Sequence, residues 1–101
     1  GVPDLLIEIL SKGNKNHDLI LKKDLYERFG VKEYWILQPL DRSLSINVLD
    51  RSGKYQSRKL LTKGDIAFSE VIPGLSVDLD EIFADIAEEP EEVYETKVRR
   101  I

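Results

Sequence analysis

A carboxylate stands inside an apolar segment near the start of this chain. Glu8 lies within residues 5–10, and the other five residues of that segment are Leu or Ile. An ionised carboxylate in such surroundings costs several kcal/mol unless a partner compensates its charge. We therefore expect a cation beside Glu8. The two candidates are a divalent metal ion, which takes oxygen ligands from carboxylates, and Lys22 of the segment that follows.

The composition narrows the kinds of site that the chain can build. It has 101 residues, no cysteine and a single histidine, so disulfides and thiolate sites are excluded and any metal is expected to be held by oxygen. No apolar run reaches the roughly 18 residues of a membrane helix. The N-terminus also lacks the pattern of a signal peptide. The sequence predicts a cytoplasmic protein with no membrane partner.

Acidic residues are concentrated towards the C-terminus. Residues 78–95 contain nine Asp or Glu and no Lys or Arg, whereas residues 1–77 contain ten acidic and twelve basic residues. The main body is therefore faintly basic, which permits contact with DNA without requiring it. The charge pattern predicts one domain over residues 1–86 and a charged tail over residues 87–101, in which the acidic run from Glu88 to Glu95 is solvated.

The first half of the chain has the pattern of a strand, a helix and a second strand. Residues 4–11 are apolar on both faces, Asn16 and Gly30 are placed to begin and end a helix, and residues 33–38 are rich in aromatic and β-branched side chains. Leu21, Leu25 and Phe29 recur at helical spacing. In a βαβ unit of this kind Glu8 lies towards the carboxyl end of its strand, where open α/β sheets place ligands.

The second half predicts antiparallel strands and a final helix. Residues 43–49 and 55–61 flank a turn at 51–54 and form a hairpin. Residues 66–68 form a short strand, and a helix follows over about 80–87.

Several motifs follow one another in a fixed order: Pro3-Asp4-Leu5, Glu8 and Ser11, then Asp18, Lys22 and Tyr26, then Gly30-Val31 and Glu33-Tyr34-Trp35-Ile36, and finally Gly53, Tyr55, Gly64-Asp65, Pro73-Gly74-Leu75, Leu79 and Ile82-Phe83. Together they resemble the Uma-type family of bacterial endonucleases, within the PD-(D/E)XK nuclease superfamily. The resemblance covers nearly all of residues 1–86. It implies an α/β, restriction-endonuclease-like fold with a mixed sheet, a βαβ unit, antiparallel strands and a C-terminal helix.

The resemblance also implies a site for phosphodiester hydrolysis of DNA with Mg²⁺, or with Mn²⁺. Glu8 falls at the acidic position of the D/E-x-K motif, and the backbone carbonyl of Ile9 would be a second metal ligand. Leu10 occupies the usual lysine position. Lys22 matches the place to which the lysine moves in this family, where it would orient the attacking water. Tyr26 lies one helical turn beyond Lys22 and could hydrogen-bond to the site.

Asp4 is a candidate for a second metal ligand, but in an extended strand it lies too far from Glu8 for this role. Four residues of extended chain separate Asp4 from Glu8 by about 13 Å at ~3.3 Å per residue, so one metal cannot bind both. We interpret Asp4 as a strand-start residue. The resemblance implies that full-length relatives carry the other metal-binding aspartate on a preceding segment that is absent here. The chain is therefore expected to be a fragment with weak or no nuclease activity.

A second reading gives Glu8 no catalytic role. It would lie in a buried salt bridge with Lys22, or be exposed at an open edge because its covering layer is missing. The chain would then be a degenerate interaction module that forms a homodimer through a sheet surface left uncovered.

Overall fold

The computed structural model describes residues 1–10, 16–87 and 97–101. It is a mixed α/β structure with these elements in chain order: β1 (Leu5–Ile9), α1 (Asn16–Phe29), β2 (Glu33–Gln38), β3 (Ser43–Leu49), β4 (Tyr55–Thr62), β5 (Ile66–Phe68), β6 (Ser76–Asp78), α2 (Leu79–Ala87) and β7 (Lys97–Arg100).

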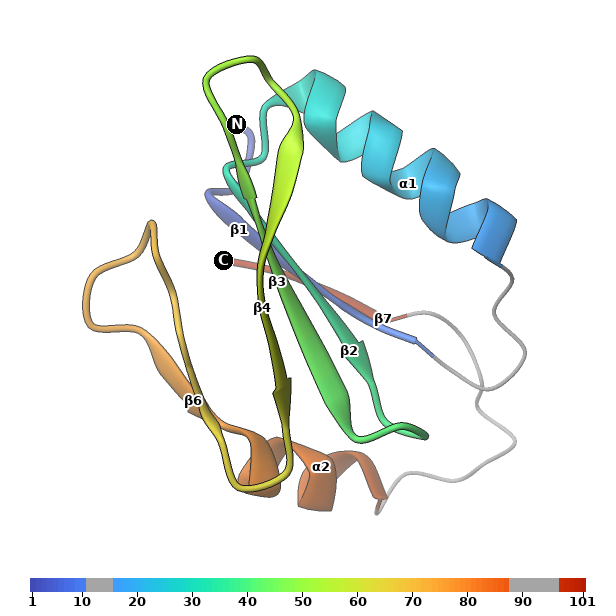
Figure 1. Ribbon diagram of the computed structural model, residues 1–101, viewed down its shortest axis with the longest axis vertical. Helices are drawn as coiled ribbons and strands as arrows, with labels where there is room; N and C mark the ends of the chain where they lie inside the picture. Colours follow the sequence, from blue (N-terminus) through green and yellow to red (C-terminus); the bar gives the residue numbers. More distant parts are fainter. Residues whose placement is uncertain (11–15, 88–96) are drawn as a thin grey trace.

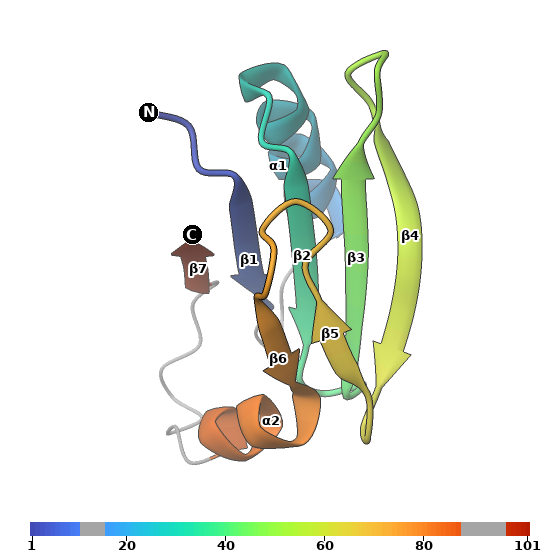
Figure 2. The same cartoon turned by 90° about the vertical axis from the view of Figure 1, so that its left-hand side faces the viewer.

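Five strands form a mixed sheet in the order β4-β3-β2-β1-β7, as Figure 2 shows. β1 and β2 are parallel, with Glu8 opposite Ile36, and the chain passes through α1 between them. The other neighbouring strands of this sheet are antiparallel. β1 therefore has a strand on each side, and all five of its residues are buried.

The sheet is covered on both faces. α1 lies on one face, whereas the small β5-β6 sheet and α2 lie on the other (Figures 1 and 2). The alternation of β1 sends Leu5, Ile7 and Ile9 into the larger core cluster beneath β5, β6 and α2. Leu6 joins a smaller cluster on the side of α1. Glu8 shares that smaller side, since side chains two apart on a strand face the same way.

Gly30 ends α1 as the sequence predicts. Its φ of 75° lies in the left-handed region, and its N–H donates to the carbonyl of Glu27 while the N–H of Val31 donates to the carbonyl of Tyr26. These two bonds are those of a Schellman motif. The turn aims the chain into β2 and fixes how α1 lies on the sheet.

α1 turns its most regular apolar residues outward. Leu21, Leu25 and Phe29 are exposed, whereas the side chains of Lys22 and Tyr26 are partly buried against the sheet. The side of α1 that carries these regularly spaced apolar residues is therefore not the side that packs against the sheet.

The segment predicted to be a charged tail contributes a strand. β7 pairs antiparallel with β1, with Val98 opposite Glu8. The acidic run from Glu88 to Glu95, which was predicted to be solvated, lies outside the residues that the structure describes. Within the described ranges no helix is long and apolar enough to cross a membrane.

A second buried carboxylate ties a loop to the sheet. Glu33 at the start of β2 is fully buried and accepts hydrogen bonds from Trp35 Nε1 at 2.7 Å and Ser69 Oγ at 2.6 Å. It also accepts the backbone N–H groups of Glu70 at 3.1 Å and Val71 at 3.2 Å. Four donors compensate the burial of this carboxylate, so Glu33 has a structural role.

We predict that Glu33→Ala lowers the free energy of unfolding by about 3 kcal/mol, because it leaves buried donors without an acceptor and opens a cavity. Urea unfolding followed by tryptophan fluorescence measures this change. Glu70→Gln is the matched control: it alters only the exposed pair with Arg58 and should cost much less. Equal losses in the two variants would contradict the role assigned to Glu33.

Candidate functional site

Glu8 is the centre of the candidate site. It lies one residue before the end of β1, and its side chain is fully buried on the side of the sheet that α1 covers. The position follows from the alternation of β1, which turns Leu6 and Glu8 towards α1 and sends Leu5, Ile7 and Ile9 into the larger core cluster. Burial of an ionised carboxylate here requires compensating donors.

Three side chains from two elements meet the Glu8 carboxylate. Lys22 Nζ of α1 lies 3.4 Å from Oε1. The hydroxyl of Tyr26, one turn further along α1, donates to Oε1 at 3.4 Å, and the hydroxyl of Tyr34 on β2 donates to Oε2 at 2.9 Å. The expected cation beside Glu8 is thus Lys22, and each carboxylate oxygen has at least one donor.

The tyrosines form an aromatic wall beside the carboxylate. The rings of Tyr26 and Tyr34 meet edge to face, with centroids 5.1 Å apart, and Tyr55 packs against Tyr34 with centroids 5.6 Å apart. Tyr55 is held by its hydroxyl, which donates to the carbonyl of Val31 at 2.7 Å. Such packing limits the movement of Tyr34 and therefore of the Glu8 side chain.

Tyr34 stays a hydrogen-bond donor over the physiological range. Burial raises the pKa of its hydroxyl, and the negative charge of Glu8 and the hydrogen bond to it raise that pKa further. A tyrosinate at this position would face the Glu8 carboxylate in a desolvated pocket, which is the costlier state.

Lys22 lies at the boundary between the buried carboxylate and solvent. Its side chain is 33% exposed, whereas that of Glu8 is fully buried. An ammonium group has three donors, so Lys22 can hold Glu8 and still present a donor and a positive charge to a ligand in solvent.

Asp4 lies apart from this cluster. Its side chain is 64% exposed and faces Lys32, with 3.9 Å between Oδ1 and Nζ. The side chain of Ile9 belongs to the larger core on the opposite face of β1 from Glu8. Of the residues predicted for the site, the structure brings Glu8, Lys22 and Tyr26 together by their side chains.

The described residues do not by themselves fit a divalent metal ion. No group of three His, Cys, Asp or Glu side chains lies together within residues 1–10, 16–87 and 97–101. Glu8 is the one carboxylate of the cluster, and both of its oxygens already face donors. An ion held by oxygen ligands needs more donors than this cluster offers.

Comparison with known proteins identifies the family. The family model Uma2, described as "Putative restriction endonuclease", matches residues 1–80. The chain belongs to this family. The matched range includes all four residues of the Glu8 cluster, and the mixed α/β architecture with its C-terminal helix is consistent with a restriction-endonuclease-like fold. Membership in the family points to nuclease activity. A search of curated proteins found no match.

Sequence reasoning missed Tyr34 as a partner of Glu8. The sequence alone favours a core or sheet-face role for this tyrosine, because it lies in an apolar strand. The proximity of Tyr34 to Glu8 follows only from the register of β1 and β2, which places Tyr34 opposite Leu6 and Ile36 opposite Glu8. Tyr34 and Glu8 are therefore diagonal neighbours on one face of the sheet.

We predict that Lys22→Met lowers the free energy of unfolding by about 1–3 kcal/mol at neutral pH, because it leaves the buried Glu8 carboxylate without its cation. The loss in free energy of unfolding caused by Lys22→Met should largely vanish in a Glu8→Gln background. Urea unfolding of the four chains of this cycle measures the coupling. Lys23→Met, a change at the adjacent exposed lysine, serves as the control. A coupling near zero would mean that the pair contributes nothing to stability.

We predict that Tyr34 also affects the free energy of unfolding at alkaline pH. A pKa raised in the folded state gives a contribution that is complete below the ordinary tyrosine pKa of about 10 and is lost as the pH rises above it. The free energy of unfolding should therefore fall more steeply above about pH 10 in the wild type than in Tyr34→Phe. Urea unfolding of both proteins between neutral and alkaline pH tests this. Parallel curves would show that Tyr34 ionises as freely as an exposed tyrosine.

Proposed function

We propose that this chain supplies the Glu8 and Lys22 part of a site for phosphodiester hydrolysis of DNA that depends on Mg²⁺ or Mn²⁺. The observation that carries the proposal is the position of Lys22, which pairs with a buried acidic residue at the carboxyl end of a parallel strand and is still one-third exposed. The family match over residues 1–80 supports a nuclease as the class of enzyme.

Three residues of the cluster have distinct tasks in this proposal. Tyr34 holds the Glu8 carboxylate in one orientation through the 2.9 Å hydrogen bond. Glu8 in turn holds the Lys22 ammonium at the solvent boundary, 3.4 Å from Oε1. The remaining N–H groups of Lys22 can donate to a phosphate oxygen or orient an attacking water, and its charge opposes the negative charge that develops on the phosphate.

The same geometry predicts weak activity for this chain alone. The cluster offers one carboxylate, and Lys22, Tyr26 and Tyr34 already meet its two oxygens. A divalent ion requires oxygen donors beyond those of the described residues. A complete site would thus need a second acidic group from outside the described part of the chain.

The test is cleavage of supercoiled plasmid DNA by purified wild-type chain with Mg²⁺, with Mn²⁺ and with EDTA. We expect slow nicking that requires a high protein concentration, is stopped by EDTA and is lost in Glu8→Gln and Lys22→Met. Lys23→Met should behave as the wild type, since this lysine is exposed beside the site.

Three results would count against this proposal. Rapid turnover would show that the site is complete within this chain. Nicking that persists unchanged in Glu8→Gln would come from another source. Complete inactivity, at protein concentrations where the wild type is folded, would favour a role without catalysis.

We also propose a second function, that of a non-catalytic module that forms a homodimer. The specific observation in its favour is the outward face of α1, where Leu21, Leu25 and Phe29 are 55%, 40% and 61% exposed. Exposed apolar side chains gathered on one element are typical of surfaces that recruit partners. Because α1 and the β5-β6 layer cover the two faces of the sheet, this helix replaces the sheet surface as the candidate interface.

A further inference from the structure

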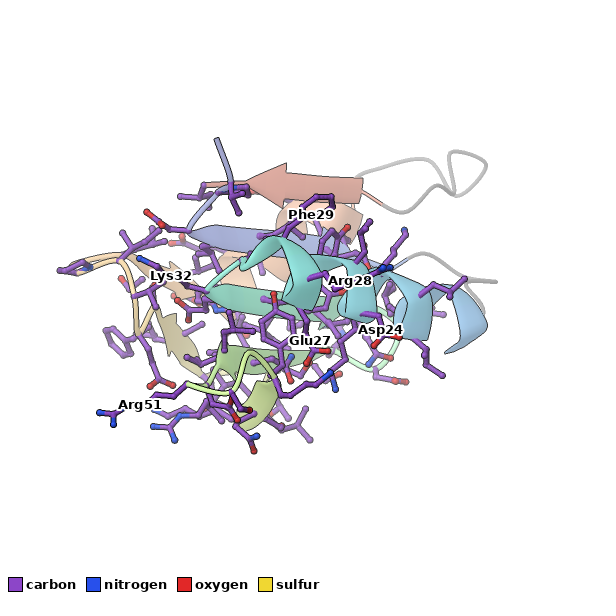
Figure 3. All side chains as sticks on the ribbon, turned by 90° about the horizontal axis from the view of Figure 1, so that it is seen from above. Asp24, Glu27, Arg28, Phe29, Lys32 and Arg51 are labelled. Atoms are coloured by element: carbon purple, nitrogen blue, oxygen red, sulfur yellow. The ribbon has the colours of Figure 1, made fainter. Side chains whose placement is uncertain are left out.

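The outward side of α1 carries an apolar stripe that we define as Leu21, Leu25 and Phe29. At 3.6 residues per turn these positions fall along one line of the helix. Lys22 and Tyr26 occupy the neighbouring side, where they turn towards the sheet to reach Glu8. Figure 3 shows Phe29 on the side of α1 towards β1 and β7, and Glu27 on the side towards β3 and β4.

A pair of opposite charges borders the stripe on its other flank. Asp24 and Arg28 are both exposed and lie one turn apart. Neither takes part in the ion pairs found within the described part of the chain. The surface therefore consists of an apolar line beside one acidic and one basic group that have no partner charge in these ion pairs.

We propose that α1 packs antiparallel against α1 of a second copy of this chain, with Leu25 near the two-fold axis and Asp24 of each copy facing Arg28 of the other. This inference rests on the second proposed function, self-association, and specifies its surface. It is independent of the nuclease proposal.

The charges of Asp24 and Arg28 favour an antiparallel pair of helices over a parallel pair. In an antiparallel pair related by a two-fold axis, each flank of the stripe faces the same flank of the partner in reversed order. The four-residue spacing of Asp24 and Arg28 then gives two equivalent opposite-charge pairs. A parallel pair would instead bring this flank against the partner's Lys22 flank, which is turned to the sheet and engaged with Glu8.

The size of the stripe sets the expected strength of the dimer. Three half-exposed side chains offer roughly 100 Å² of apolar surface each. This is a few hundred Å² for each copy, below the roughly 800 Å² that each partner buries in a standard interface. A weak, reversible dimer is therefore expected. The charge pairs at its exposed rim fix the register more than they add affinity.

Sedimentation velocity of the whole chain over a wide range of protein concentration is the first test. The wild type should dimerise reversibly, and Leu25→Ser should raise the dissociation constant at least tenfold. Ile20→Ser is the matched control because Ile20 is 61% exposed on the same helix but lies about 140° around it from Leu25. Its dissociation constant should stay within about twofold of the wild-type value. Circular dichroism establishes that each variant is folded.

A charge exchange tests the antiparallel register. Asp24→Arg and Arg28→Asp should each weaken the homodimer, because each places like charges opposite one another. The double variant Asp24→Arg/Arg28→Asp should restore it. An equimolar mixture of the two single variants should form a heterodimer more readily than either variant dimerises alone.

The outcomes separate the inference from the function on which it rests. A wild type that stays monomeric at the highest concentration overturns both. A dimer that Leu25→Ser leaves unchanged overturns the α1 interface, although self-association stands. A dimer that Leu25→Ser weakens but that the charge exchange fails to restore overturns the antiparallel register.

Discussion

The charge of one buried carboxylate governs how this molecule is put together. Glu8 lies inside the sheet on the side that α1 covers, and its burial is tolerable only with donors close at hand. α1 is accordingly oriented so that Lys22 and Tyr26 reach inward. The same orientation leaves Leu21, Leu25 and Phe29 exposed. α1 thus places against the sheet the side that supplies donors to Glu8, and its most regular apolar side stays exposed.

The orientation of α1 links the two functions proposed for the chain. The inward side of α1 holds an ammonium group at the edge of solvent, which suits contact with a phosphate and agrees with membership in a family of nucleases. The outward side carries apolar surface that suits a second copy.

Much of this arrangement could be predicted from the sequence, since it rests on local patterns. The apolar run around Glu8 indicated a buried strand that needs a cation, and the helical segment that follows supplied Lys22 as a candidate. The strands of the β3-β4 hairpin and the left-handed Gly30 also follow from local signals. Such signals depend on nearby residues only.

The remaining features depend on contacts between distant segments. Tyr34 meets Glu8 only because of the register of β1 and β2. Glu33 finds three of its four donors in a loop more than thirty residues away. β7 forms within the segment predicted to be a charged tail, because it pairs with the edge of β1. Which side of α1 faces the sheet was likewise decided by a partner on another element.

Lys22 compensates the charge of Glu8 within the described residues, so this chain should not bind a divalent metal ion tightly. Calorimetric titration of Mg²⁺ and Mn²⁺ into the wild type and Glu8→Gln tests it most directly. We expect no micromolar binding in either protein, because the Glu8-dependent nicking proposed above requires only weak binding at the high metal concentration of the assay. Binding of one ion per chain in the micromolar range by the wild type, abolished in Glu8→Gln, would contradict it. That result would mean that the chain completes a metal site around Glu8.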